Sequence, residues 1–164
     1  MKVLGLDPGS RYTGYGLIEK DGSSLTAVSF GRFATPKKPL PERLAFLTRE
    51  LRDLLTREEP DATALETPFQ GLNPRSLIVL AQTRGALLAV IAETRRPVRE
   101  YTPAEVKAAV SGYGRADKAQ VAAMVRRILG LGSRRLSADA ADALAVAICC
   151  AQMTRYADLE DRSR

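Results

Sequence analysis

The stretch MKVLGLDPGSRYTGYG, residues 1–16, decides the fold. The apolar run at residues 3–6 ends abruptly at Asp7, and Pro8 and Gly9 then turn the chain away, a pattern that predicts a short buried strand with a carboxylate at its end. Removing an unpaired carboxylate from water costs several kcal/mol, so Asp7 requires a cation, a proton or hydrogen-bond donors beside it. A simpler alternative is that Asp7 only caps the turn through the backbone N–H of Gly9.

Length and composition indicate one globular domain. The chain has 164 residues, of which 45% are hydrophobic and 27% charged, enough for one core without disulfides or metals as staples. The apolar run at residues 144–150 is far shorter than the ~20 residues of a membrane span, and the N-terminus lacks a signal-peptide pattern. These features predict a cytoplasmic protein that does not use a membrane.

Several kinds of catalysis are excluded by composition. The chain contains no histidine, so neither an imidazole base nor a histidine-bearing zinc site is possible. The only cysteines, Cys149 and Cys150, are adjacent and cannot form a disulfide framework. Any catalysis must therefore depend on carboxylates, lysines, hydroxyls or a hard metal ion.

The charge balance favours a polyanionic partner. Lys and Arg number 25 against 19 Asp and Glu, which gives a net charge of +6. Most of the positive charge comes from arginine, whose planar fork suits phosphate. A genome that prefers arginine codons would produce the same excess, so composition alone leaves nucleic acid as one of two explanations.

The order of patterns predicts a mixed α/β domain. Strands are expected at residues 12–19 and 24–33 around a hairpin turn at 20–22, so that three antiparallel strands open the domain. Gly14 and Gly16 lie inside the second strand, which suggests that another segment approaches its backbone closely. After a helix that begins at residue 41 and stops before Pro60, short strands at 61–66 and 97–101 flank a long helix at 75–95. That helix is apolar all round, which predicts burial against both the sheet and a partner subunit.

Three more helices complete the predicted domain. One follows the capping box of Thr102 and Glu105 and ends near residue 111, and another spans about 117–129. Lys118 lies in the first turn of that second helix, where a cation opposes the helix dipole, so either an anion binds there or the side chain is simply solvated. Ser137 can cap the last helix.

Three further acids are candidates to accompany Asp7. Glu66 also ends a short apolar strand, while Asp139 and Asp142 lie at i and i+3 on one face of the alanine-rich last helix. Like charges about 4 Å apart repel by ~4 kcal/mol at an effective dielectric constant near 20, so four clustered carboxylates require a cation. A set of hard oxygen ligands indicates Mg²⁺ or Mn²⁺, and two such ions would suit phosphodiester hydrolysis.

The chain resembles the RuvC family of bacterial Holliday-junction resolvases over residues 1–153. The matching motifs are GLDPGSRYTGYG (5–16), ETPF (66–69), QTRG (82–85), YTPAEVK (101–107), GRADKAQVAAMVRRILGL (114–131) and DAADALA (139–145). The resemblance implies a ribonuclease-H-like α/β fold, with a five-stranded mixed sheet in which three antiparallel strands are followed by two parallel ones. We expect residues 1–156 to form one nuclease domain and the charged segment 157–164 to form a flexible tail.

The same resemblance implies a function and its residues. It predicts a homodimer that nicks four-way DNA junctions symmetrically with two Mg²⁺ ions per subunit, or Mn²⁺ in their place, alongside the branch-migration proteins RuvA and RuvB. The family's catalytic and metal-binding carboxylates fall on Asp7, Glu66, Asp139 and Asp142. Its DNA-binding residues fall on Phe69, Lys107 and Lys118, where Phe69 would stack on an unpaired base.

Other functions remain open from the sequence alone. One is a junction-binding module without catalysis, although such a protein has no need of all four acids. Another is a nuclease of the same fold that acts on a different nucleic acid. A third is a nucleotide binder related to the sugar kinases, for which this chain is short.

Overall fold

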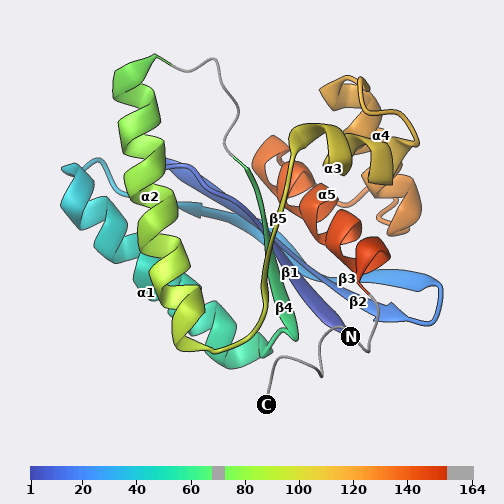
Figure 1. The fold of residues 1–164 in the computed structure, drawn as a ribbon, viewed down its shortest axis with the longest axis horizontal. Coiled ribbons are helices and arrows are strands. Elements are labelled where there is room, and N and C mark those ends of the chain that lie inside the picture. Colours follow the sequence, from blue (N-terminus) through green and yellow to red (C-terminus); the bar gives the residue numbers. More distant parts are fainter. Residues whose placement is uncertain (68–72, 155–164) are drawn as a thin grey trace.

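A computed structural model describes residues 1–67 and 73–154 of the chain, and it forms a central sheet with helices on both faces (Figure 1). The strands are β1 (Lys2–Asp7), β2 (Tyr12–Asp21), β3 (Ser24–Ala34), β4 (Ala62–Glu66) and β5 (Val98–Tyr101). The helices are α1 (Leu40–Glu58), α2 (Pro74–Glu93), α3 (Pro103–Ser111), α4 (Lys118–Ile128) and α5 (Ala138–Met153). Every element predicted from the sequence is present within the described part of the chain.

The strand order is β3-β2-β1-β4-β5. The pairs β1–β2 and β2–β3 are antiparallel, whereas β4 is parallel to both β1 and β5, which confirms the predicted mixed sheet. The hairpin turn lies slightly later than predicted. Asp21 still pairs with Ser24, so the turn consists of Gly22 and Ser23, and Gly22 adopts the positive φ of 56° that this tight connection requires.

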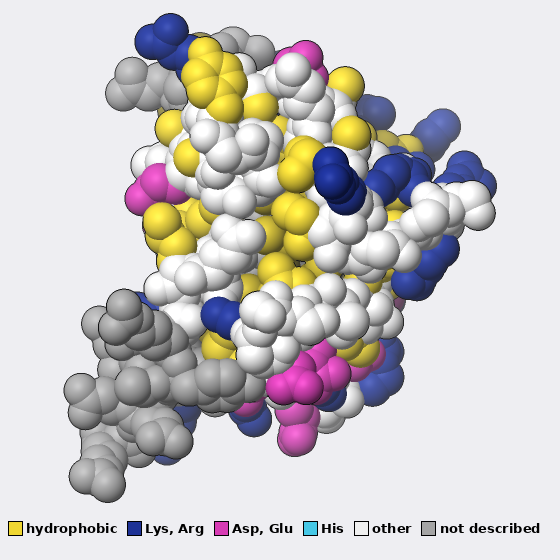
Figure 2. All heavy atoms as spheres, turned by 90° about the vertical axis from the view of Figure 1, so that its right-hand side faces the viewer, with side chains coloured by type: hydrophobic (Ala, Val, Ile, Leu, Met, Phe, Trp, Pro, Cys, Tyr) yellow, Lys and Arg dark blue, Asp and Glu magenta, His cyan; other side chains and the backbone are white. Residues whose placement is uncertain are grey.

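The two faces of the sheet carry separate hydrophobic cores because strand residues alternate between faces. Leu4 and Leu6 of β1 belong to the core beneath α1 and α2, together with Leu47 and Leu87. Val3 belongs to the opposite core, formed mostly by α3, α4 and α5. Figure 1 shows α1 and α2 on one side of the strands and the three later helices on the other, the side that faces the viewer in Figure 2.

Helix α5 lies directly against the backbone of β1 and β2. A Cβ atom built on Gly5 would lie 2.0 Å from the carbonyl oxygen of Ala143, and one on Gly14 would lie 2.0 Å from that of Asp139. Gly16, which pairs with Gly5, would meet the side chain of Leu144 at 2.7 Å. The strand glycines predicted to admit a close neighbour therefore admit α5, and with it the two aspartates at its start.

Helix α2 has one buried face and one exposed face. Leu87 and Ile91 are fully buried, whereas Leu77 and Ile78 are 43% and 59% exposed. Among the helices of the described residues, α2 is the one whose length and mean hydropathy of 1.5 would allow it to cross a membrane. The prediction that the chain uses no membrane rested on the apolar run at residues 144–150 and did not include α2. In this structure Leu87, Val90 and Ile91 of α2 belong to the hydrophobic core, and 28% of the apolar stretch is buried.

Candidate active site

Two of the predicted acids lie side by side at the ends of parallel strands. Leu6 of β1 pairs with Leu65 of β4, so the next residues, Asp7 and Glu66, lie at the carboxyl ends of neighbouring strands, at the same end of the sheet. The backbone N–H of Gly9 donates to Thr13 Oγ1 at 3.4 Å, which gives the turn its own hydrogen bond. This contact disfavours the alternative in which Asp7 serves as the cap of that turn.

The first turns of α5 bring the other two acids to this edge. Ser137 caps the helix as predicted, with its Oγ accepting a hydrogen bond from the N–H of Ala140. Asp142 lines a pocket of about 190 Å³ together with Asp7 and Glu66. Asp139 does not line this pocket, but its charge acts on Asp7, so it lies within electrostatic reach.

Both predicted lysines line the same pocket. Lys107 comes from α3, whose start is fixed by the predicted capping box of Thr102 and Glu105. Lys118 is the first residue of α4, and its Nζ donates to Asp142 Oδ2 at 3.1 Å. The anion beside Lys118 in this structure is therefore the aspartate of α5, which raises the pKa of the lysine. Because the Lys118 side chain is 83% exposed, it also remains open to a ligand in solvent.

The clustered carboxylates perturb one another. Burial raises the pKa of Asp7 to about 7, and the negative charges of Asp142, Asp139 and Glu66 add to the effect. The pKa of Glu66 is also raised, by burial and by Asp142, against the opposing effects of Lys118 and Lys107. The pocket therefore favours either a proton or a cation beside Asp7, as the sequence predicted.

The oxygen donors present are of the kind that hold Mg²⁺ or Mn²⁺. Within residues 1–67 and 73–154, however, no three acidic side chains converge as a ready ligand set. The partners of the α5 acids explain this, because Asp142 is paired with Lys118, and Asp139 Oδ2 lies 3.1 Å from Arg32 Nη1. The donor chemistry fits a divalent ion, and binding one would require the α5 carboxylates to exchange these cations for metal.

Arg32 is a neighbour of the site that the sequence analysis did not identify. It lies on the edge strand β3, and its guanidinium also covers the ring of Tyr12, with 4.1 Å from Cζ to the ring centroid. No local sequence pattern predicts a pair that joins positions 107 residues apart.

Arg84 of α2 is the second residue missed. It is only 8% exposed, and its Nη1 donates to the backbone carbonyl oxygen of Glu66 at 2.7 Å. Its Nη2 lies 2.6 Å from Glu100 Oε1, an ion pair without the angle of a hydrogen bond. Arg84 thus connects the backbone of Glu66 to Glu100 in β5. The signal was available, since an arginine in the middle of an apolar helix requires a partner.

Phe69, the predicted DNA-stacking residue, lies outside the described residues, and so does the predicted tail at 157–164. Thr67 is the last described residue before Phe69. Its N–H donates to the carbonyl oxygen of Tyr101 at 2.8 Å, so the segment leaves the sheet from a fixed point beside Glu66.

Comparisons with known proteins agree on one family. A family model described as crossover junction endodeoxyribonuclease RuvC matches residues 3–150. A crossover junction endodeoxyribonuclease RuvC from Syntrophomonas wolfei is 49% identical over 150 residues, which cover 91% of this chain and 87% of that protein. Another, from Alkalilimnicola ehrlichii, is 44% identical over 99% of this chain and 96% of its own length.

Among solved structures, Thermus thermophilus RuvC in complex with a Holliday junction substrate superposes with a TM-score of 0.86. The two sequences are 34% identical, and the match covers 92% of this chain and 93% of the other. The likeness confirms the ribonuclease-H-like α/β fold expected from the sequence.

Proposed function

The chain belongs to the RuvC family of crossover junction endodeoxyribonucleases, and we propose that it resolves four-way (Holliday) DNA junctions by symmetric, metal-dependent nicking. The observation that carries the proposal is the pocket lined by Asp7, Glu66, Asp142, Lys107 and Lys118. It joins carboxylates, which suit divalent metal ions, with lysines, which suit phosphate, at one end of the sheet, in a chain whose net charge of +6 suits DNA.

The four carboxylates Asp7, Glu66, Asp139 and Asp142 would hold two Mg²⁺ ions, for which Mn²⁺ would substitute. When bound, such ions supply an activated water on one side of the scissile phosphorus and neutralise charge on the leaving 3′ oxygen on the other. The raised pKa of Asp7, about 7, supports this assignment because burial and the neighbouring carboxylates make its negative charge costly, and a bound cation would relieve that cost.

The two lysines would bind the scissile phosphate. Lys107 and Lys118 lie on different helices but line the same pocket, so each can approach a phosphate held over the carboxylates. Lys118 would exchange its contact with Asp142 for the phosphate, which frees that aspartate for metal. Phe69 would stack on an unpaired base at the crossover and hold the junction open.

We further propose a homodimer formed through α2. Its exposed face carries Leu77 and Ile78 and, about two turns further along, Gly85, where an added Cβ would meet nothing within 4 Å in the single subunit. A glycine costs a helix about 1 kcal/mol relative to alanine, so close approach of a second subunit would account for it. Two subunits related by twofold symmetry would place their two active sites on the two DNA strands of like polarity in the junction, as symmetric nicking requires.

The remaining assignments rest on the family resemblance. Residues 1–156 would form the nuclease domain, with 157–164 as a tail. The protein would work in the cytoplasm, where bacterial DNA lies, and would receive junctions from RuvA and RuvB.

A paired-nick assay tests the proposed function. A mobile four-way junction and linear duplex of the same sequence, both end-labelled, are incubated with the protein in Mg²⁺, Mn²⁺ or EDTA. Asp142→Asn is assayed in parallel, with Asp53→Asn on the exposed face of α1 as the matched control. We expect paired nicks on the junction alone, lost in EDTA and in Asp142→Asn while junction binding survives.

Two results would contradict this proposal. Tight junction binding without nicks in any metal would leave a binding module. Nicking by Asp142→Asn at the native rate would remove that residue from the catalytic set.

A further inference from the structure

A basic groove lies beyond the active site, between the β1–β2 turn and the loop that follows β3. It has a volume of about 610 Å³ and is lined by Arg11, Tyr12, Lys37, Lys38 and Arg43 together with small loop residues. None of its lining residues is acidic. Glu42 lies nearby, at 4.0 Å from Lys38 Nζ, but both side chains are more than half exposed, so this pair is weak.

The walls of the groove are fixed by hydrogen bonds. Thr35 donates its N–H to the carbonyl oxygen of Arg11 at 3.0 Å and its hydroxyl to that of Ser10 at 3.0 Å, which joins the two loops. Arg43 Nη1 donates to Ser10 Oγ at 3.1 Å and so ties the start of α1 to the same turn. The Nε of Arg43 is buried and has no hydrogen-bond partner among the described residues. The groove is thus preorganised by hydrogen bonds that join its two loops to the start of α1.

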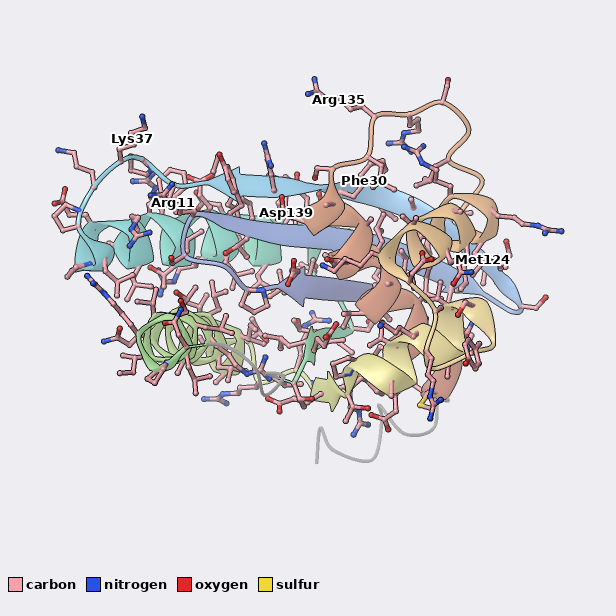
Figure 3. The ribbon with its side chains drawn as sticks, turned by 90° about the horizontal axis from the view of Figure 1, so that it is seen from above. Arg11, Phe30, Lys37, Met124, Arg135 and Asp139 are labelled. Carbon is pink, nitrogen blue, oxygen red and sulfur yellow. The ribbon has the colours of Figure 1, made fainter. Side chains whose placement is uncertain are left out.

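Contacts between side chains connect this groove to the active site. Tyr12 lines the groove, Arg32 covers the Tyr12 ring, and the same guanidinium pairs with Asp139. In Figure 3, Arg11 and Lys37 lie at the end of the molecule near the start of α1, with Asp139 next along the strands. A ligand that spans the acids can therefore continue over Arg32 and Tyr12 into the groove.

We propose that this groove binds the phosphodiester backbone of the junction arm that flanks the cut, a role that rests on the proposed function. Its cations are spread along two loops and the start of α1, and Lys37 and Lys38 are both exposed, as suits an extended polyanion rather than a single small ion. The contacts would fix the orientation of the arm without reading its bases.

Salt-dependent binding tests the groove. The dissociation constant for a four-way junction is measured in EDTA between about 50 and 300 mM KCl for the native protein and for Lys37→Ala/Lys38→Ala. The control is Arg57→Ala/Arg96→Ala, which removes the same charge at the opposite end of the sheet, where these arginines pair with Glu58 and Asp61.

We expect the groove variant to bind on the order of tenfold more weakly, with the slope of log K against log salt reduced by about 2. Ethylation interference at phosphates flanking the cut should disappear in this variant and persist in the control. A slope and an interference pattern equal to those of the native protein would overturn the inference.

Nicking by the native protein is scored separately, so the two proposals can fail independently. Native nicking with an unchanged slope in the groove variant would reject the groove alone. A reduced slope without native nicking would reject the proposed function and leave a DNA-binding groove.

Discussion

Arg32 Nη1 lies 3.1 Å from Asp139 Oδ2, so this carboxylate, which we propose as a metal ligand, is already paired with a guanidinium. Two unit charges about 4 Å apart interact by ~1 kcal/mol in water, and this pair is partly solvent-exposed. We therefore predict that Arg32→Gln tightens the binding of Mn²⁺ to the DNA-free protein by about fivefold. Titration followed by electron paramagnetic resonance of free Mn²⁺ measures this affinity directly.

Arg49→Gln is the matched control, because Arg49 pairs with Glu50 on the surface of α1. It should leave Mn²⁺ binding unchanged. Weaker binding in Arg32→Gln would mean that the arginine orients Asp139 for the metal rather than competing with it.

The pKa of Asp7 predicts an unusual pH dependence of stability. Its value in the folded protein is about 7 against 3.8 for the free side chain, so the folded state binds a proton more tightly than the unfolded state. The stabilisation from this proton is complete below about pH 4 and is lost as pH rises to about 7. The raised pKa of Glu66 acts in the same direction. The difference for Asp7 corresponds to roughly 4 kcal/mol.

Urea denaturation in EDTA measures this effect. The free energy of unfolding of the native protein should be lower at about pH 8 than at about pH 5.5, and Asp7→Asn should remove most of the difference. Added Mg²⁺ should stabilise the native protein mainly at the higher pH, where the carboxylates are ionised. Equal pH dependence in the native protein and Asp7→Asn would show that Asp7 titrates normally.

Arg84 provides a third prediction, because it holds the Glu66 backbone rather than its carboxylate. Arg84→Met leaves the carbonyl oxygen of Glu66 and the carboxylate of Glu100 without their partner, which should lower the free energy of unfolding by about 1 to 3 kcal/mol. A displaced Glu66 should also lower kcat for junction nicking while leaving KM near its native value, since Arg84 does not line the pocket.

Glu100→Gln separates the two effects of Arg84. It weakens the ion pair but retains the contact of Arg84 with Glu66, so nicking should stay close to native. The contrary result is an equal loss of unfolding free energy in Arg84→Met and Glu100→Gln, with native kcat in both under conditions where both are folded. Arg84 would then have a structural role only.

The sequence predicted the helices and strands better than the contacts between side chains. Apolar runs ending at Asp7 and Glu66 identified β1 and β4, and capping patterns at Thr102 and Ser137 identified the starts of α3 and α5. These signals are local, because each depends on residues a few positions apart. The parallel pairing of β1 with β4, which brings Asp7 beside Glu66, was expected only from the family resemblance, because β2, β3 and α1 separate the two strands in the chain.

The contacts of Arg32 and Arg84 could not be obtained in this way. Arg32 meets Asp139 because β3 lies at one edge of the sheet and α5 crosses its face, a relation that no short pattern contains. The basic groove likewise combines residues of the β1–β2 turn with the loop after β3. Such sites depend on where loops meet in space, whereas the sequence showed only that each loop carried cations.

The exposed face of α2 leads to the last prediction, which concerns the proposed homodimer. In the single subunit a side chain at Gly85 would meet open space, and leucine is a better helix former than glycine by roughly 1 kcal/mol. Gly85→Leu should therefore leave the folded subunit intact or more stable, yet block close approach of a second α2. Sedimentation velocity should show a native dimer and a monomeric variant with native circular dichroism. Ala45→Leu on the exposed part of α1 is the control and should remain a dimer. A dimer that persists in Gly85→Leu would place the interface on another surface, and a monomeric native protein would remove the basis for symmetric nicking by paired sites.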